Sequence, residues 1–262
     1  CQSGQFRSKE QHDACKAVLF AENNVFLVLP TGEGKSIVFF MDCVVNSSVT
    51  HLLVTPTIAL KNDMVRRARE HNIRVTDEID EYQGQNLLIL VTDTAVSWGT
   101  INFLMELSSR NLLGDIFIDE AHTYVTDSNY RESMKMLTRL VRLERKIILM
   151  TATAPSHIAT LICNDFFPCS TPTFIRASTN RPSIVYTSGY QTRAQDILDS
   201  IRQKIRDYAD EDRMSVDFAT KRNMEFLANA LGREARVHTS EQSDSEKAEA
   251  NADWRRGTVK CI

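Results

Sequence analysis

The sequence predicts an α/β protein built on a parallel sheet with helices on both faces. Two observations predict it: short β-rich runs recur along the chain, and segments of helix length separate them. Strands that alternate with helices are joined by right-handed crossovers, which bury a parallel sheet on both faces. The expected strands are Val25–Leu29, His51–Thr55, Leu87–Thr92, Asp115–Asp119 and Lys146–Thr151.

The first expected strand leads into a glycine-containing loop with the sequence Leu29-Pro30-Thr31-Gly32-Glu33-Gly34-Lys35-Ser36. A strand, a tight turn and Lys-Ser at the start of a helix form the context of a phosphate-binding loop. Its backbone N–H groups would point at a triphosphate, with Lys35 on the β and γ oxygens and Ser36 on Mg²⁺. The usual pattern begins with glycine where this chain has Leu29, so a glycine-rich turn formed by chance is the alternative.

Two adjacent carboxylates, Asp119 and Glu120, close the fourth expected strand. One carboxylate of such a pair can bind Mg²⁺ through water, and the next can orient or deprotonate an attacking water in phosphoryl transfer. We expect Asp119 in the metal role and Glu120 in the water-activating role. His122 follows them, either as a structural hydrogen-bonding residue or as a relay.

Threonines end the fifth expected strand, in the sequence Thr151-Ala152-Thr153. Their hydroxyls can couple the carboxylate site to a neighbouring domain through hydrogen bonds, and ordinary strand-end capping is the alternative. Because ligands of parallel sheets sit beyond the carboxyl ends of the strands, we expect this segment, the loop and the carboxylates at one edge.

The composition changes after Pro155, where a stretch rich in Pro, Ser, Thr and Asn indicates a connector. A second set of signals follows, and we expect a first domain over residues 1–172, a linker over 173–182 and a second, incomplete domain over 183–262. In the second domain the expected strands are Ser183–Thr187, Ser215–Ala219 and Ala235–His238, and the expected helices are Ala194–Ala209 and Asn223–Leu231.

The composition excludes several classes of protein. Hydrophobic residues make up 42% and charged residues 25%, values that are typical of a soluble globular protein. The net charge of −3 argues against a wholly basic surface but permits a local stripe of phosphate contacts. No apolar stretch reaches the roughly 18 residues of a membrane span. The cysteines are scattered without a CxxC pair, which argues against disulfides and a zinc site.

Together the motifs carry a resemblance to a known family. They are Phe6-Arg7-Ser8, Gln11, residues 30–36, Thr55-Pro56-Thr57, Asp119-Glu120-Ala121-His122 and Thr151-Ala152-Thr153, followed by Arg181-Pro182-Ser183-Ile184-Val185-Tyr186 and Asp217-Phe218-Ala219-Thr220-Lys221. In this order they resemble the RecQ family of DEAH-type DNA helicases, and in detail its divergent fungal, telomere-linked branch. The resemblance runs from about residue 5 to the last residue.

The resemblance implies two RecA-like domains of the P-loop NTPase class, the second one truncated. It implies an ATP-dependent DNA helicase that moves 3′→5′ on single-stranded DNA and unwinds duplexes, in the nucleus and in DNA repair and recombination. ATP and Mg²⁺ are the implied cofactors. Arg7 and Gln11 are expected at the adenine, beside the loop of residues 29–36. The implied DNA contacts are Pro56, Thr57, Thr92, Tyr130, Arg131 and Thr220.

The chain departs from the family pattern in three places. Thr92-Asp93-Thr94 stands where the family has Thr-Pro-Glu, and the aromatic-rich loop after the carboxylates is reduced to Asp127-Ser128-Asn129-Tyr130-Arg131, without its Trp and His. The chain ends at Ile262, where motif V would begin, so motifs V and VI with the arginine finger are missing from it. An arginine finger contributes ~10³–10⁵ in kcat, so we expect ATP binding to exceed hydrolysis.

Two other functions fit the same motifs. One is a nucleotide-gated nucleic-acid-binding module without productive catalysis, as a degenerate or truncated copy. The other is an RNA helicase or a double-strand translocase of the same superfamily, which would differ in its response to the 2′-OH of RNA.

Overall fold

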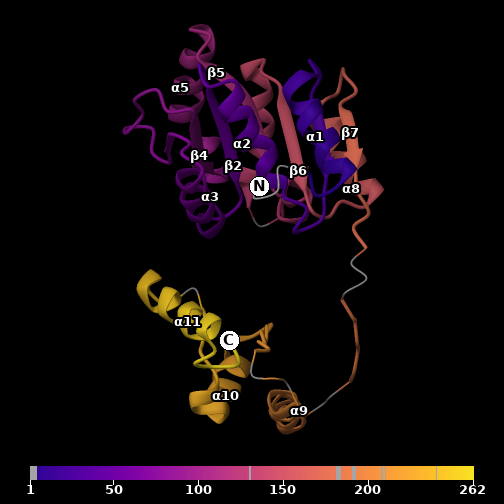
Figure 1. Cartoon of the computed structure of the whole chain (residues 1–262), viewed down its shortest axis with the longest axis vertical. Coiled ribbons are helices and arrows are strands. Elements are labelled where there is room, and N and C mark those ends of the chain that lie inside the picture. The colour runs from indigo at the N-terminus through magenta and orange to yellow at the C-terminus, as the bar shows by residue number, and fades with distance from the viewer. Residues whose placement is uncertain are drawn as a thin grey trace. The chain divides into compact units, whose positions relative to one another are not determined.

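The computed structural model describes residues 5–129, 131–180, 184–190, 193–207, 209, 211–239 and 241–262. The chain forms two compact units, residues 1–182 and 183–262 (Figure 1). Tyr130 and the segment Arg181-Pro182-Ser183, which belong to the predicted motifs, lie outside the described residues. Each unit is treated separately below.

The described part of the first unit contains a seven-stranded sheet in the order β3-β4-β2-β5-β6-β1-β7. All of its pairings are parallel, which confirms the predicted sheet type. The strands are β1 (Val25–Val28), β2 (Thr50–Thr55), β3 (Val75–Thr76), β4 (Leu87–Val91), β5 (Leu113–Ile118), β6 (Ile147–Thr151) and β7 (Thr173–Arg176).

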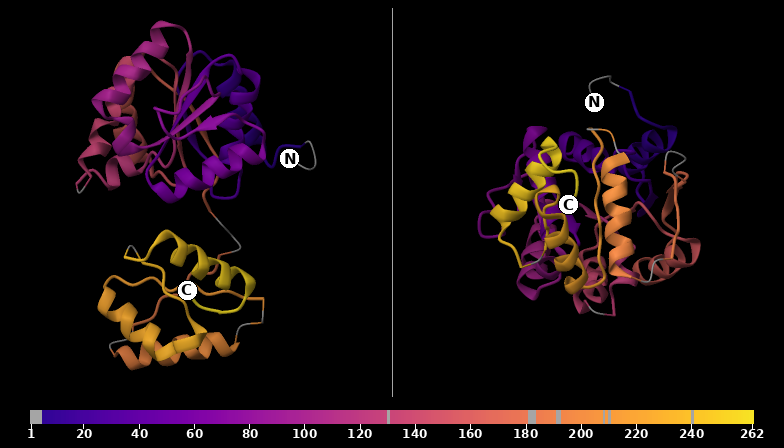
Figure 2. Two further views of the ribbon diagram at one scale, coloured as in Figure 1. Left: turned by 90° about the vertical axis from the view of Figure 1, so that its left-hand side faces the viewer. Right: turned by 90° about the horizontal axis from the view of Figure 1, so that it is seen from below.

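Helices cover both faces of this sheet (Figure 2, left). Alternate residues of β1 enter separate cores: Val25 and Leu27 pack in one, Phe26 and Val28 in the other. This period of two is the signature of a strand buried on both sides. The first core is covered by α1 (Lys9–Phe20), α2 (Lys35–Val45) and α3 (Ile58–Glu70), and the second by α5 (Trp98–Ser109), the 3₁₀ helix η1 (Met136–Leu143) and α8 (Ser156–Phe166).

Short helices complete the carboxyl edge of the sheet. They are α4 (Thr92–Ala95), α6 (Thr123–Thr126) and α7 (Glu132–Lys135). Thr92, expected at the end of a strand, instead begins α4, because β4 ends at Val91 opposite Thr55. The side chain of Thr92, at this helix start, is buried.

The expected linker over 173–182 is wrong at its start. Residues Thr173–Arg176 form β7, which pairs with β1 in the register Val25↔Thr173. Pro168 and Pro172 indicated a connector, but the ring of Phe174 packs edge-on against Phe26 with centroids 5.2 Å apart. That contact and the main-chain pairing keep the segment in the first unit.

The second unit has α9 (Ala194–Asp207), α10 (Lys221–Leu231), the 3₁₀ helix η2 (Gly232–Glu234) and α11 (Asp244–Arg256). Its predicted strands are wrong within the described residues: only the isolated parallel bridges Met214↔Cys261 and Ala235↔Cys261 form there. Each segment meets Cys261 at a single residue, which is too short for a ladder. The apolar residues nevertheless gather in a small core with Leu198, Leu227 and Leu231.

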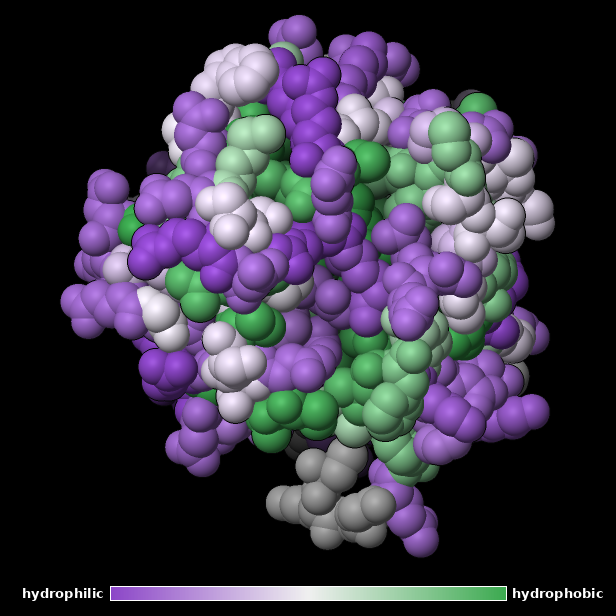
Figure 3. Space-filling view, turned by 90° about the horizontal axis from the view of Figure 1, so that it is seen from above, coloured by the Kyte–Doolittle hydropathy of each residue, from purple (hydrophilic) through white to green (hydrophobic). Residues whose placement is uncertain are grey.

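The surface seen from above is largely hydrophilic, with apolar side chains between the polar ones (Figure 3). Within the described part of the chain, no helix is both long and apolar enough to cross a membrane.

Candidate functional site

The glycine-containing loop joins β1 to α2 at the carboxyl edge of the sheet. Gly32 (φ +92°) and Gly34 (φ +76°) both adopt the left-handed region that favours glycine. A Cβ on Gly34 would press on the side-chain amide of Gln11, and the left-handed backbone there would strain any other residue. Among the described residues no side chain caps α2, and the N–H of Ile37 donates to the carbonyl of Gly34 (3.0 Å), so the N–H groups of Lys35 and Ser36 are the ones at this helix start that an anion can use.

The carboxylates follow β5, two strands away from β1. The N–H of Asp119 donates to the carbonyl of Val54 (2.9 Å), which holds the pair against the end of β2. Glu120 has a left-handed backbone (φ +48°), and its Oε1 lies 3.4 Å from Nζ of Lys35. The structure thus brings together the lysine and the carboxylates that the sequence placed at one edge.

The two carboxylates have different electrostatic surroundings. Burial, and then the charge of Glu120, raise the pKa of Asp119 to about 6, although Lys35 opposes this rise. Burial also acts to raise the pKa of Glu120, but the hydrogen bond with His122 and the charge of Lys35 outweigh it and bring that pKa below its usual value. Glu120 is therefore ionised at neutral pH, and Asp119 is a buried carboxylate that a cation would stabilise.

His122 connects the carboxylates to the end of β6. Its Nδ1 lies 3.3 Å from Oε2 of Glu120 and 2.8 Å from Oγ1 of Thr151. The Thr151 hydroxyl donates to the carbonyl of Thr153 (2.9 Å), so it accepts from His122 Nδ1–H. These contacts form one path from Glu120 to Thr153, in which His122 is both a structural hydrogen-bonding residue and a candidate relay.

Arg67, on α3, belongs to an arginine cluster that the sequence suggests for phosphate contacts or for a solvated helix face, but its contact with the loop was not predicted. Its guanidinium donates a hydrogen bond to the hydroxyl of Ser36, and its Nη1 lies 3.8 Å from Oδ2 of Asp63. Ser36 is only 8% exposed, so this contact covers the hydroxyl expected to bind the metal. No local motif signals it, because 31 positions separate the two residues along the chain.

Arg7 and Gln11 lie against the same loop. The hydroxyl of Ser8 caps α1 by accepting a hydrogen bond from the N–H of Gln11. The side chain of Gln11 is buried. The Gln11 amide accepts from the N–H of Arg7 (2.7 Å) and donates to the carbonyl of Gly34 (3.3 Å). The Arg7 guanidinium donates to the carbonyl of Gly32. The start of α1 is therefore fastened to both glycines of the loop.

Most of the expected DNA contacts lie at the carboxyl edge. Thr57 is exposed and caps α3, whereas Thr92 is buried and its hydroxyl lies 3.3 Å from the carbonyl of Thr55. Arg131 donates to the carbonyl of Pro56 (2.7 Å) and to Asp93 Oδ2 (2.9 Å). Arg131 thus ties together the ends of two neighbouring strands.

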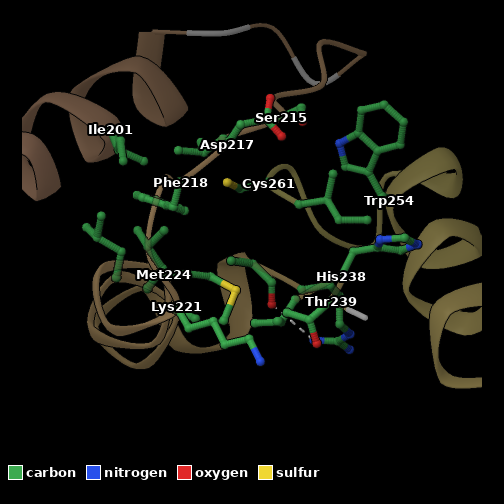
Figure 4. A pocket seen from close by; sticks show the side chains of 18 of the residues that line it. Ile201, Ser215, Asp217, Phe218, Lys221, Met224, His238, Thr239, Trp254 and Cys261 are labelled. Atoms are coloured by element: carbon green, nitrogen blue, oxygen red, sulfur yellow. Dashed lines mark hydrogen bonds between the residues drawn. The ribbon is translucent and has the colours of Figure 1, made fainter. Parts of the chain in front are cut away.

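Thr220 lies in the second unit, where it precedes α10 and is exposed. It borders a cavity of about 520 Å³. Figure 4 shows Phe218 and Met224 on one side of this cavity and His238 and Trp254 on the other. The structure does not bring Thr220 together with the other site residues within one unit.

Part of the chain matches a known protein family. The sequence model described as DEAD/DEAH box helicase matches residues 8–161. The chain belongs to this family. The match spans the loop, the carboxylates and Thr151-Ala152-Thr153, and it ends within α8.

Curated relatives of this helicase-family chain include RecQ-type DNA helicases, which confirms the resemblance drawn from the motifs. It is 30% identical over 140 residues to the ATP-dependent DNA helicase RecQ of Synechocystis (47% of this chain, 28% of the relative). It is 29% identical over 133 residues to the ATP-dependent DNA helicase Q5 of Rattus norvegicus (45% and 14%). It is 26% identical over 219 residues to the ATP-dependent helicase SGS1 of Saccharomyces cerevisiae (75% and 15%). The chain thus spans under a third of the length of each.

Solved structures show the same fold at low identity. The DUF1998 helicase MrfA bound to DNA and AMPPNP has a TM-score of 0.71 at 16% identity, covering 97% of this chain and 41% of that one. Dbp5 of S. cerevisiae bound to RNA and ADP BeF3 has a TM-score of 0.72 at 16% identity, covering 99% and 70%. These matches confirm the RecA-like α/β fold predicted from the sequence.

Within the described residues, no group of three or more His, Cys, Asp or Glu side chains is placed to hold a metal ion. Mg²⁺ needs fewer protein ligands, because it keeps several waters and binds substrate phosphates. Ser36 and Asp119 supply oxygen ligands of the kind that Mg²⁺ prefers.

Proposed function

We propose that this chain binds ATP with Mg²⁺ and that its parent protein couples ATP hydrolysis to movement along single-stranded DNA, as an ATP-dependent DNA helicase. The observation that carries the proposal is the 3.4 Å approach of Lys35 Nζ to Glu120 Oε1, between the loop after β1 and the end of β5. DNA as the substrate is supported by the relatives from Rattus norvegicus and Synechocystis, which are both named ATP-dependent DNA helicases.

The residues at the edge fit a magnesium–nucleotide complex. The uncapped start of α2 and the two left-handed glycines suit phosphate oxygens, and Lys35 adds a positive charge beside them. Ser36 and Asp119 would hold Mg²⁺, which supplies neutralisation of the charge on the phosphate oxygens when bound. Burial raises the pKa of Asp119 to about 6, and a cation bound beside this carboxylate would favour its ionised form.

Glu120 is the residue that acts on the attacking water. Its lowered pKa keeps it ionised, so it can accept a hydrogen bond or a proton from water. His122 Nδ1 lies close to the second carboxylate oxygen of Glu120 and also contacts the hydroxyl of Thr151. Through this path a change at Glu120 would reach the segment between β6 and α8.

The test uses the whole chain and two variants of the site. Nucleotide binding is measured with a fluorescent ATP analogue, and hydrolysis by phosphate release with and without single-stranded DNA. Lys35→Ala is expected to abolish binding. Glu120→Gln is expected to keep binding and to lower hydrolysis by about 10²–10⁴-fold, because the acceptor for the water proton is gone. Glu106→Gln, the same change on the exposed face of α5, is the control.

Each outcome has a meaning. Unchanged binding by Lys35→Ala would contradict the proposal. Binding without any hydrolysis by the parent protein, in the presence or absence of DNA, would favour the nucleotide-gated binding module. The 3′→5′ direction, the nuclear location and the roles in DNA repair and recombination belong to the same proposal and rest on the resemblance. The direction is tested on the parent protein with duplexes that carry a 3′ or a 5′ tail.

A further inference from the structure

Trp98 is a large aromatic side chain on the surface of the first unit. It is the first residue of α5 and is 61% exposed. Ser97 caps the helix by accepting from the N–H of Thr100 (3.2 Å), which fixes the backbone under the indole. An exposed tryptophan on a well-anchored helix start is a rigid apolar surface with one polar edge.

Arg139, from η1, lies over the ring of Trp98. Its guanidinium carbon is 4.8 Å from the ring centroid, and its Nη1 donates to the carbonyl of Val96 (3.1 Å). In a 3₁₀ helix residues three apart share a row, so Arg139 and Arg142 form a cationic row beside the buried row of Leu137, Leu140 and Leu143. The surface therefore combines an aromatic face with fixed positive charge.

This surface continues the edge where DNA contacts are expected. Arg131 binds Asp93 on α4 and the carbonyl of Pro56. Arg139 binds Val96, the residue that follows the last residue of α4. The short helix that begins with Thr92 is thus held by one arginine at each end, and Trp98 stands beside the second of them.

We propose that Trp98, with Arg139 against its ring, is a stacking platform for a base of single-stranded DNA. The inference rests on the proposed function, because it names a second contact of the same substrate. Every base has a π face that stacks on an indole, and a guanidinium can pair with the adjoining phosphate. The platform supplies an aromatic contact on the same unit whose loop at 127–131 lacks the family's Trp and His.

The first measurement uses the fluorescence of Trp98 itself. The chain contains two tryptophans, Trp98 and Trp254, so the Trp254→Phe variant reports on Trp98 alone. Titration with an oligothymidylate of about 15 nucleotides is expected to quench this fluorescence as bases stack on the indole. Quenching that is absent while the oligonucleotide binds, as followed by anisotropy of a label on the DNA, would overturn the inference.

The second measurement compares affinities. Trp98→Ala is expected to weaken binding about tenfold, whereas Trp98→Phe, which keeps a stacking ring, retains most of it. On an oligonucleotide of the same length with abasic sites throughout, the unaltered chain and Trp98→Ala are expected to bind equally. A loss that is the same on abasic and normal DNA would show that Trp98 acts through the fold and would overturn the inference.

The control is Phe20→Ala. Phe20 is an exposed aromatic residue at the end of α1, and its removal is expected to leave DNA binding unchanged. The failure of this inference is distinguishable from failure of the proposed function. If the unaltered chain binds no single-stranded DNA, the proposed function fails. If it binds and Trp98→Ala binds as tightly, only the platform fails.

Discussion

Two clusters of ionisable side chains lie at opposite edges of the same sheet. The cluster at the carboxyl edge consists of Lys35, Asp119, Glu120 and His122. The cluster at the amino edge consists of Asp42, His51, Asp115 and Lys146. Each contains a lysine, a histidine and two acids, so composition does not distinguish them.

The amino-edge cluster is held by ion pairs and main-chain contacts, although Asp42 Oδ2 and His51 Nε2 are buried without a hydrogen-bond partner among the described residues. His51 Nδ1 lies 3.1 Å from Asp42 Oδ2 and 3.1 Å from the main-chain nitrogen of Asp115. Lys146 pairs with Asp115 (2.7 Å) and donates to the carbonyl of Val18 (2.6 Å). His51 and Asp42 are 1% and 0% exposed, respectively.

The carboxyl-edge cluster is more open and lies beside main-chain groups that suit a ligand. The side chains of His122 and Glu120 are 27% and 25% exposed, against 2% and 0% for His51 and Asp42, whereas the two lysines are alike at 14% and 15%. The contact of Lys35 with Glu120 is 3.4 Å. The glycine loop and the uncapped start of α2 lie next to them. The comparison teaches that the surrounding backbone and the access, rather than the set of charges, make one cluster a candidate site and the other a structural core.

The largest expected difference between the edges is in stability. His51→Ala removes the partner of the buried Asp42 and is expected to lower the free energy of unfolding of the first unit by about 3–5 kcal/mol. Glu120→Gln is expected to change it by less than about 1 kcal/mol, because Glu120 is partly exposed. Denaturant unfolding followed by Trp98, the tryptophan of the first unit, measures both. Equal losses of unfolding free energy in the two variants would contradict this difference between the two edges.

The close packing of the amino edge gives a second test. A Cβ on Gly114 would lie 2.8 Å from both Cε1 of His51 and Cγ2 of Val49. Gly114→Ala is therefore expected to destabilise the first unit by about 1–3 kcal/mol through overpacking. Gly99→Ala is the matched control, because no described atom lies within 4 Å of its Cβ position and alanine favours the α5 helix. A melting temperature unchanged by Gly114→Ala would contradict the description of this edge as closely packed.

The smallest expected effect is a pH dependence at the amino edge. Burial, although opposed by Lys146, raises the pKa of Asp115 from 3.8 to about 6. Between about pH 7 and pH 5 the folded chain therefore gains a proton that the unfolded chain does not, so Asp115 makes the protein more stable as the pH falls.

The variant Asp115→Asn removes this proton uptake. Relative to it, the unaltered chain is expected to gain about 1 kcal/mol of stability on going from about pH 7 to pH 5. Asp42 does not contribute in this range. Burial acts to raise its pKa, but the hydrogen bond and charge of His51, together with the hydrogen bond from Asn46 and the charge of Lys146, hold that pKa below its usual value. Parallel pH profiles for the two proteins would show that Asp115 is not desolvated.

The site could be predicted from the sequence because its parts are local. The loop of residues 29–36 is contiguous, and Asp119-Glu120 directly follows an apolar strand. The rule that parallel strands end at one edge then placed both together without knowledge of the strand order. The same reasoning failed for Arg67 and for the pair of Trp98 and Arg139, because these meet across helices at separations that no motif fixes.

Strand predictions succeeded or failed according to the available partners. Leu87–Val91 is buried between two neighbours, and its apolar run predicted it well. Ser215–Ala219 and Ala235–His238 alternate apolar with polar residues, and only single bridges form near them. The opposite error occurred at β7: the nearby prolines indicated a linker, but the segment forms a strand that pairs with β1. A strand-like sequence therefore shows only that a segment can pair with another strand, and the rest of the fold decides whether such a strand is present.

The contact of Arg67 with Ser36 has a consequence for the order of events at the loop. A guanidinium group already touches the serine hydroxyl. Under the proposed function, arrival of a divalent ion with its nucleotide is an exchange of one cation for another, since the two positive charges repel each other at that oxygen. Arg67 would then have to leave the Ser36 hydroxyl for the ion to bind there, so binding would include a rotation of this side chain.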